Sequence, residues 1–339
     1  MKGADRMIEE IIFESYGINP EREEAGGKYP SFISGPTIYS IIPLGEVNQD
    51  ELKERKMMAD QLINQGDRYV ADFVMANHGG FVSEAEEQPF VLVAVRTLHE
   101  PRSHQLGRKV AKFHYRARGI SEPIKVCSRI GQWKELWEQR IDQLEQIWNE
   151  KLKAHPNNPF EEEFIATFPY YMALGETAIQ YLVDTEIDDT PTASDSGTVC
   201  YDRFTSETWN GKYCIKNPFE WIFDHGSRDI AEWVRHHYLH NQHTYQPGVS
   251  TFMSDYQTIG PLSSFSSRLL YSRLMFPIHY YEVVEEYFSS PTEARANELE
   301  EQIQTMANTS TYYEEFLRRF YEIAHIPSKQ LRLPDVSWL

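Results

Sequence analysis

The hydrophobic residues of this chain change their spacing near residue 97, and that change restricts the fold more than any other feature. Before it, apolar runs such as Thr37–Ile42 and Phe90–Val95 are short and rich in β-branched residues, which is typical of strands. After it, aromatic and aliphatic residues recur three and four positions apart between Trp133 and Leu152, the period of an amphipathic helix. The spacing predicts an α+β protein with a β-rich first part and a helical second part.

The first part also contains one helix signal. Asn48 is a favourable N-cap, Glu51 completes a capping box, and Gly66 is a stop signal. Because Phe90–Val95 is apolar at every position, we expect a strand with both faces covered.

The second part is predicted to be helical apart from one β-like stretch. There, Asn210-Gly211 lies between Thr208–Trp209 and Tyr213–Ile215, a strong type I′ hairpin signal. The predicted helices cover residues 104–118, 133–152, 160–182, 263–288, 292–306 and 310–324. We therefore predict a bilobal, protein-kinase-like fold. A small β-rich N-terminal lobe (1–97) joins, near Arg96–Pro101, a large and mainly helical C-terminal lobe (98–339) with a central β-hairpin at about 199–221.

The charge balance and the cysteines exclude several classes of protein. Lysine and arginine number 33 and aspartate and glutamate 51, a formal net charge of −18 at pH 7. Such a surface repels the phosphates of nucleic acids and anionic lipids, so we predict no nucleic-acid partner. Cys127, Cys200 and Cys214 lack the spacing of a zinc site or a disulfide framework. Without a signal-peptide pattern or a long apolar run, we expect a soluble protein made in the cytoplasm, with no transmembrane segment.

Three segments of the second part resemble a known superfamily. They are Val199–Glu207, Ile215–Phe219 and Asp224–Ala231. Their order and spacing are similar to those of the aminoglycoside phosphotransferase and choline kinase superfamily. Within it, the chain looks most like the spore-coat-associated, kinase-like proteins of the CotS and YutH type.

The resemblance implies roles for individual positions. The superfamily's catalytic loop reads H-x-D-x-x-x-x-N, in which the Asp accepts the substrate proton and the Asn holds a metal ion. Asp202 matches that Asp, whereas Cys200 and Glu207 stand where the His and the Asn would be. Asn217 falls at the Asp that bridges Mg²⁺ to the phosphates, and a neutral amide attracts a cation less strongly. Lys216 beside it adds a charge that we expect to repel a metal ion.

Two later acids and the N-terminal lobe complete the comparison. Asp224 and Asp229 match acids that, in the family, fix the loop and cap the next helix. A kinase also needs a strand lysine for the phosphates, paired with a helix glutamate. The strand before the Asn48-capped helix has no lysine, and the chain has no G-x-G-x-x-G loop. Glu51 or Glu54 would therefore lack its lysine partner.

Two groups of residues have alternative interpretations. Asp202 is either a remnant of the catalytic base or a loop carboxylate that binds nearby backbone N–H groups. His236, His237, His240 and His243 have a spacing that can hold zinc. We interpret them as a polar helix end, with a histidine-dependent metal binder as a weaker alternative, and predict no metal site.

The sequence thus favours a kinase-fold, pseudokinase-like protein with a degenerate active site, acting structurally or in assembly during sporulation. By resemblance, its place is the spore coat or envelope and its partners are other coat or cortex proteins. We expect no cofactor. The alternative is an active, ATP-dependent and Mg²⁺-dependent small-molecule phosphotransferase with a hydroxyl acceptor, whose altered metal site uses Asp202, Glu207 and Asp224.

Overall fold

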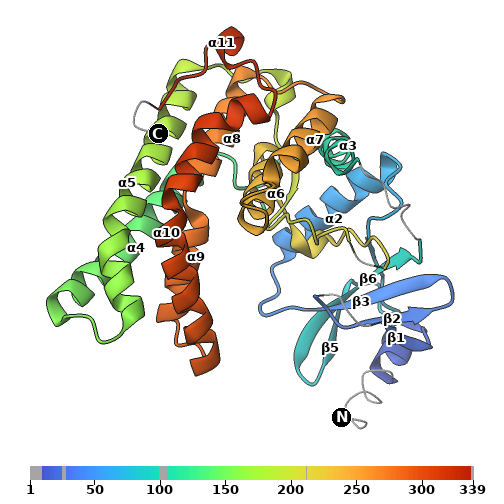
Figure 1. The fold of residues 1–339 in the computed structure, drawn as a ribbon. Helices are drawn as coiled ribbons and strands as arrows, with labels where there is room; N and C mark the ends of the chain where they lie inside the picture. The colour runs from blue at the N-terminus through green and yellow to red at the C-terminus, as the bar shows by residue number, and fades with distance from the viewer. Residues whose placement is uncertain (1–9, 25–27, 99–104, 211, 337–339) are drawn as a thin grey trace. The chain divides into compact units, whose positions relative to one another are not determined.

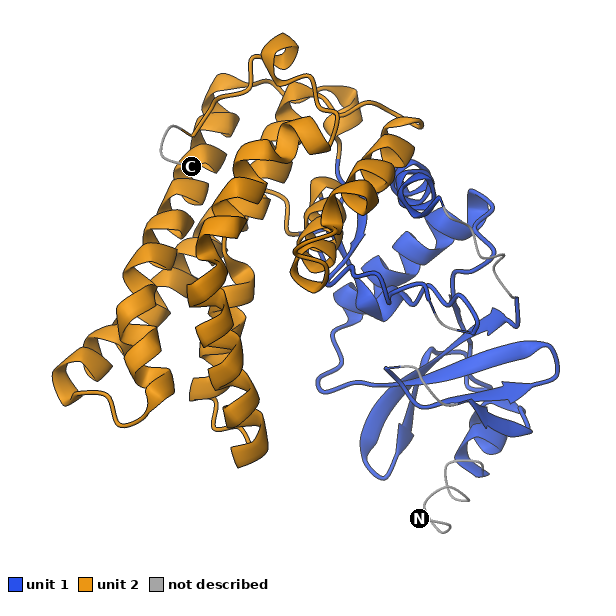
Figure 2. Ribbon diagram, in the orientation of Figure 1, with its two compact units in different colours: residues 1–128, 197–224 blue, residues 129–196, 225–339 orange. Residues whose placement is uncertain are grey.

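The computed structural model describes residues 10–24, 28–98, 105–210 and 212–336 (Figure 1). The chain forms two compact units, one of residues 1–128 and 197–224 and the other of residues 129–196 and 225–339 (Figure 2). We call them unit 1 and unit 2. These units divide the chain differently from the predicted lobes, because part of the second half of the chain belongs to unit 1. The lobe boundary at 97/98 stays a prediction, and residues 99–104 beside it lie outside the described residues.

Unit 1 is built on a six-stranded antiparallel sheet. Its strands are β1 (Arg22–Glu24), β2 (Ser31–Ser34), β3 (Thr37–Pro43), β4 (Asp72–Phe73), β5 (Val82–Ala85) and β6 (Gln88–Arg96). The order is β1-β2-β3-β6-β4, and β5 also pairs with β6. Strand β3 pairs with β6 from Thr37↔Arg96 to Pro43↔Phe90, whereas β4 and β5 pair with successive parts of β6. The strands predicted at residues 37–42 and 90–95 are confirmed.

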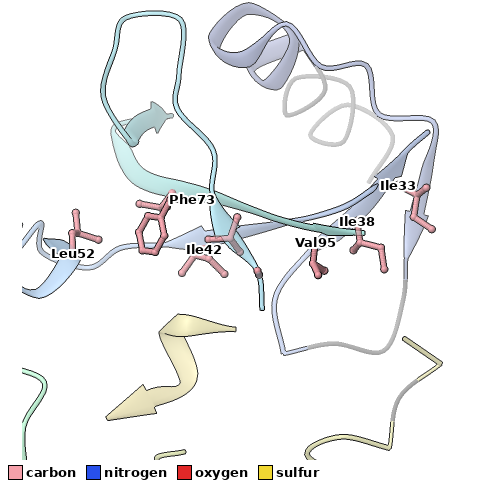
Figure 3. Packing of buried hydrophobic residues seen from close by; sticks show 9 residues of the cluster. Ile33, Ile38, Ile42, Leu52, Phe73 and Val95 are labelled. Carbon is pink, nitrogen blue, oxygen red and sulfur yellow. The ribbon is translucent and has the colours of Figure 1, made fainter. Parts of the chain in front are cut away.

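Both faces of β6 are covered, as its unbroken apolar sequence predicts. Successive side chains of a strand point to opposite faces. On one face, Val91, Val93 and Val95 pack with Ile38, Ile42, Leu52 and Phe73 (Figure 3). On the other face, Phe90 and Leu92 pack with Phe32 and with Ile12 and Tyr16. Ile12 and Tyr16 belong to a helical segment at residues 10–16. Strand β6 is therefore the centre of the unit 1 core.

Helix α2 (Gln49–Asn64) begins where the sequence predicts. Oδ1 of Asn48 accepts hydrogen bonds from the backbone N–H groups of Asp50 and Glu51, both at 3.1 Å. The Glu51 carboxylate pairs with Arg55. The helix ends at Asn64; Gly66 follows the C-cap Gln65, and its φ of 82° suits a residue without Cβ.

The predicted tight hairpin at Asn210-Gly211 is wrong, although an antiparallel pair does exist in this region. Strand β7 (Thr198–Tyr201) pairs with β8 (Trp221–Asp224), and a long connection joins them. In that connection, Thr205 N donates to Thr208 Oγ1 at 2.9 Å, and Asn210 N donates to Glu207 O at 3.1 Å. These bonds form a turn in which Thr208 belongs to no strand, while Gly211 lies outside the described residues. Helix α3 (Leu106–Ala117) completes unit 1, and Thr198 Oγ1 donates to its His114 carbonyl at 2.7 Å.

Unit 2 is helical. Its helices are α4 (Trp133–Ala154), α5 (Pro159–Asp188), α6 (Ser227–His240), α7 (Tyr245–Gln257), α8 (Ser264–Met275), α9 (Ile278–Phe288), α10 (Glu293–Ile323) and α11 (Ser328–Leu331), with a 3₁₀ turn at Ala193–Asp195. Helix α5 packs on α4, α8 and α10, and α6 packs on α8. Aromatic side chains fill the core, and the Trp137 ring stacks on that of Phe276 at 4.3 Å between centroids. In the described chain, no helix combines the length and the apolar character that crossing a membrane requires.

Two predicted helix boundaries are wrong. The helix predicted at residues 263–288 is interrupted between α8 and α9, where Pro277 lacks the N–H that a continuous helix needs. Conversely, the segments 292–306 and 310–324 form the single helix α10. The Thr305 and Thr309 hydroxyls bond to carbonyls four residues earlier, both at 2.7 Å, so these polar residues do not interrupt it.

The packing of α4, α5 and α9 generates a prediction at Gly175. A Cβ on this residue would overlap Oη of Tyr281 and lie 2.9 Å from Cδ1 of Ile141. Both neighbours are buried, so we expect Gly175→Ala to lower the free energy of unfolding by about 1–3 kcal/mol through overpacking. Gly260→Ala is the control, because a Cβ there meets no atom within 4 Å. Urea denaturation measures both, and equal stabilities would contradict the packing.

Candidate functional site

The three sequence-predicted site residues, Asp202, Glu207 and Asn217, all lie on the connection between β7 and β8 in unit 1. Asp202 directly follows β7; its side chain is exposed, and its backbone N–H donates to Glu220 O at 2.9 Å. Glu207 is exposed in the turn after it and accepts a hydrogen bond from the Asn210 amide at 3.3 Å. Two exposed carboxylates thus lie on this loop.

Asn217, which the resemblance matches to the family's metal-binding Asp, has a different environment. Its side chain is 4% exposed, and its Oδ1 accepts a hydrogen bond from Phe219 N at 3.0 Å. It thereby caps the 3₁₀ helix η2 (Pro218–Glu220). An amide oxygen has a second lone pair but no charge, so Asn217 offers a cation at most a weak, neutral ligand.

Lys216 is held in a buried ion pair, and the expectation that its charge repels a metal ion stays a prediction. Its Nζ lies 2.7 Å from Oδ2 of Asp67, and these side chains are 7% and 1% exposed. The ammonium group also lies 4.6 Å from the ring centroid of Trp209 and 5.1 Å from that of Phe113. Arg116 approaches the same Asp67 oxygen at 3.4 Å. A paired and buried charge of this kind acts mainly on its own partners.

Backbone hydrogen bonds hold the same segment in place. Lys216 N donates to Tyr69 O at 2.8 Å, and Ala71 N donates to Lys216 O at 2.9 Å, forming a short parallel bridge. The side chains of Ile215 and Phe219 pack against the sheet core. The segment that carries Asn217 is therefore joined to the strand region before β4.

Arg55 of α2 fixes this segment from a second direction. Its Nη1 donates to the carbonyl oxygens of Pro218 at 2.7 Å and Trp221 at 3.0 Å. Its Nε donates to Glu51 at 2.8 Å, and its guanidinium lies 5.3 Å from the centroid of the Phe219 ring. Glu51, a candidate for the helix glutamate, therefore serves to orient Arg55.

Glu54, the other candidate, is buried and holds a loop. Its two carboxylate oxygens accept backbone N–H bonds from Lys125, Val126 and Cys127, at 2.8 to 3.1 Å. Burial alone would raise the pKa of Glu54, but these hydrogen bonds outweigh it and the pKa lies below its usual value. Because that bonding favours the ionised form, its stabilising effect is present above the unfolded-state pKa of about 4.3 and is lost as the pH falls further.

Strand β3 provides no phosphate-binding cation. Its buried positions are Ile38, Ser40 and Ile42, and Ser40 Oγ pairs with Ser31 Oγ at 2.9 Å. The strand has no lysine, as read from the sequence.

The remaining motif positions are buried. Cys200 lies in β7, where its Sγ donates to Asp224 O at 3.8 Å. Asp224 ends β8 and is 1% exposed. The expected capping of the next helix by acids is wrong in its detail, because Gly226 is the N-cap of α6 without a side-chain cap. Asp229 instead lies in the first helical turn, where its charge suits the helix dipole.

The four histidines line the end of α6 and the residues after it. His236 and His240 stack at 4.1 Å between centroids, and His240 Nδ1 lies 2.8 Å from His236 O. His237 stacks on Trp233 at 4.8 Å, and burial lowers its pKa. These contacts are those of a polar helix end.

Sequence reasoning missed two residues, Asp67 and Arg55, that hold the site together, and it named Glu54 only as a possible lysine partner. Asp67 and Lys216 are 149 positions apart, and no local pattern pairs them. The available signal was Lys216 itself, a charged residue directly after the apolar pair Cys214-Ile215.

The chain matches a family model described as "Spore coat putative kinase YutH" over residues 9–320. It is 40% identical over 334 residues to the endospore coat-associated protein YutH of Bacillus subtilis, covering 98% of each chain.

Solved structures with similar folds are phosphotransferases. An aminoglycoside phosphotransferase from Alicyclobacillus acidocaldarius has a TM-score of 0.63 at 13% identity, over 91% of this chain and 93% of its own. A microcompartment-associated aminopropanol kinase has a TM-score of 0.57 at 12% identity, over 94% and 98%. At these identities the likeness concerns the fold, and it confirms the predicted kinase-like fold.

The buried ion pair leads to a testable prediction. Lys216→Ala leaves the Asp67 carboxylate buried, with Arg116 as its remaining ion-pair partner. We expect this to lower the free energy of unfolding by about 3–5 kcal/mol, as for other buried pairs that lose one member. Lys212→Ala is the matched control, because Lys212 is largely exposed and its ion pair with Glu24 lies at the surface. Similar urea midpoints for the two variants would contradict a structural role for Lys216.

Proposed function

Because this chain belongs to the spore coat YutH family, we propose that it is a coat-associated protein that keeps the kinase fold with a degenerate active site. Its role would be structural or in assembly, with other coat or cortex proteins as partners. The family membership and the phosphotransferase-like fold are the premises. The loss of catalysis and the structural role are the proposal.

The observation that carries this proposal is the state of Asn217. Phosphoryl transfer depends on positioning and on neutralising the phosphate charge. At Asn217 a neutral amide replaces the metal-binding carboxylate and is used as a helix cap. The anchors from Arg55, Asp67 and the Tyr69–Ala71 backbone support a fixed segment.

Charge elsewhere in unit 1 supports the same conclusion. Strand β3 has no lysine to meet the phosphates, and Lys216 is already paired with Asp67. Glu207 adds a negative charge five residues after Asp202. In a chain of net charge −18, a nucleotide polyphosphate would be repelled unless a cation were tightly held.

One observation favours the alternative of an active phosphotransferase. Asp202 and Glu207 are exposed carboxylates, and hard divalent cations prefer oxygen ligands of this type. Such a site would use Glu207 where the family has an asparagine. Asp224, the third residue of this alternative, is buried at the end of β8.

Nucleotide binding separates the two functions. A ligand at about 100 times its Kd stabilises a fold by about 2.7 kcal/mol, which raises the Tm of a chain of this size by about 2 °C or more. We expect millimolar MgATP to give no such shift. A Mg²⁺-dependent shift that disappears in Glu207→Ala would support the phosphotransferase and contradict the degenerate site.

Localisation tests the structural role. A fluorescently tagged protein is expected to be absent from growing cells and to form a shell around the developing spore. Because the proposed role does not depend on catalysis, Asp202→Ala should localise in the same way. Uniform fluorescence throughout growing cells would contradict coat association.

A further inference from the structure

Unit 2 contains a pocket that includes none of the kinase-motif residues described above, although His240 of the histidine group is part of its lining. It lies among α5, α6, α9 and α10 and has a volume of about 530 Å³, within the usual range of small-molecule sites. Tyr171, Tyr238, His279 and Tyr313 form its aromatic lining, and Glu298 and Glu301 of α10 are its acidic residues.

Two polar atoms among the aromatic lining residues lack partners. Oη of Tyr171 donates to Met306 O at 3.1 Å, and Oη of Tyr313 donates to Leu274 O at 2.6 Å. By contrast, Oη of Tyr238 and Nδ1 of His279 are buried without a hydrogen-bond partner among the described residues. The whole Tyr238 side chain is 1% exposed. Buried polar groups are almost always paired, so these two atoms, in residues that line one pocket, lack a partner that a molecule held in that pocket would supply.

Both of these groups are neutral near pH 7. Burial lowers the pKa of His279 to about 3, and the nearby Arg235 cation acts in the same direction. Burial also raises the pKa of the Tyr238 phenol. A neutral imidazole and a phenol can each donate or accept, and a hydroxyl group satisfies either one.

The two acidic residues of the pocket, in contrast to these neutral groups, bring negative charge. The Glu301 carboxylate is exposed and has no ion-pair partner within the described chain, whereas Glu298 pairs with Arg295 at 2.7 Å. No lysine or arginine lines the pocket as far as the structure describes it. Carboxylates accept hydrogen bonds and attract cations, so this part of the pocket favours an ammonium group and disfavours an anion.

We propose that this pocket binds a small organic ammonium ion whose apolar body ends in a hydroxyl group. The ammonium pairs with Glu301, the body packs on the aromatic lining, and the hydroxyl satisfies Tyr238 and His279 directly or through one ordered water. This binding does not depend on the proposed function, because the residues concerned are all in unit 2.

Tyramine is the probe, because it carries an ammonium and a phenol at opposite ends of an aromatic body. Phenethylamine lacks the hydroxyl, and 3-(4-hydroxyphenyl)propionate has a carboxylate in place of the ammonium. Titrations of the full chain followed by NMR should show saturable binding of tyramine. Phenethylamine should bind about fivefold more weakly, the usual effect of one neutral hydrogen bond, and the propionate should not bind.

Variants assign the binding to this pocket. Glu301→Gln should weaken tyramine binding by about tenfold, whereas Glu300→Gln, with the same charge change outside the pocket lining, should leave it unchanged. Tyr238→Phe should raise the Tm of the free protein, since it removes an unpaired buried hydroxyl. It should also reduce the preference for tyramine over phenethylamine, because His279 is then the only one of the two groups left to bond to the ligand hydroxyl.

Three outcomes would overturn the proposal. The first is no saturable binding of tyramine at millimolar concentration. The second is equal binding of the amine and the carboxylate probes. The third is equal tyramine affinity in Glu301→Gln and Glu300→Gln.

Discussion

The buried carboxylate of Asp67 is the interaction on which the candidate site of unit 1 depends. It pairs with Lys216 at 2.7 Å and with Arg116 at 3.4 Å, so it joins α3 and the β7–β8 connection to the chain just after α2. Its desolvation is offset by two cations and, for Lys216, by contacts with aromatic rings. Two paired cations and one carboxylate leave an excess of positive charge, which the partly exposed Arg116 carries towards solvent.

The sequence correctly predicted those elements that depend on interactions between residues close together in the chain. The Asn48 cap needs only its own helix, and the covering of β6 follows from an unbroken apolar run. The failures have different causes: Pro277 interrupts a predicted helix locally, whereas other errors depend on a partner far along the chain or on side chains that bond to the backbone. The Thr208 hydroxyl accepts a backbone hydrogen bond and forms a turn where a hairpin was predicted. Lys216 pairs with Asp67, which lies 149 positions away in the sequence.

For the site itself, the sequence located Asp202, Glu207 and Asn217 but not their environments. Spacing alone cannot tell an exposed carboxylate from a buried amide that caps a helix. The role of Arg55 could not be predicted either. Its acceptors are backbone carbonyls, which every residue type has, so the sequence does not indicate them. The proposed loss of catalysis therefore rests on both sequence and structure. The sequence shows which charged residues are absent, and the structure shows which contacts the remaining side chains make.

The capping hydrogen bond of Asn217 also bears on how a kinase fold can be kept when its catalytic activity is lost. Asparagine and aspartate cap helices about equally well, so either residue preserves the turn at Pro218–Glu220. As helix caps the two residues are therefore equivalent, although at this buried position the neutral amide avoids the cost of burying a charge. Under the proposed loss of catalysis, a single exchange of aspartate for asparagine at this position removes a metal-binding carboxylate and keeps the cap on which the turn depends.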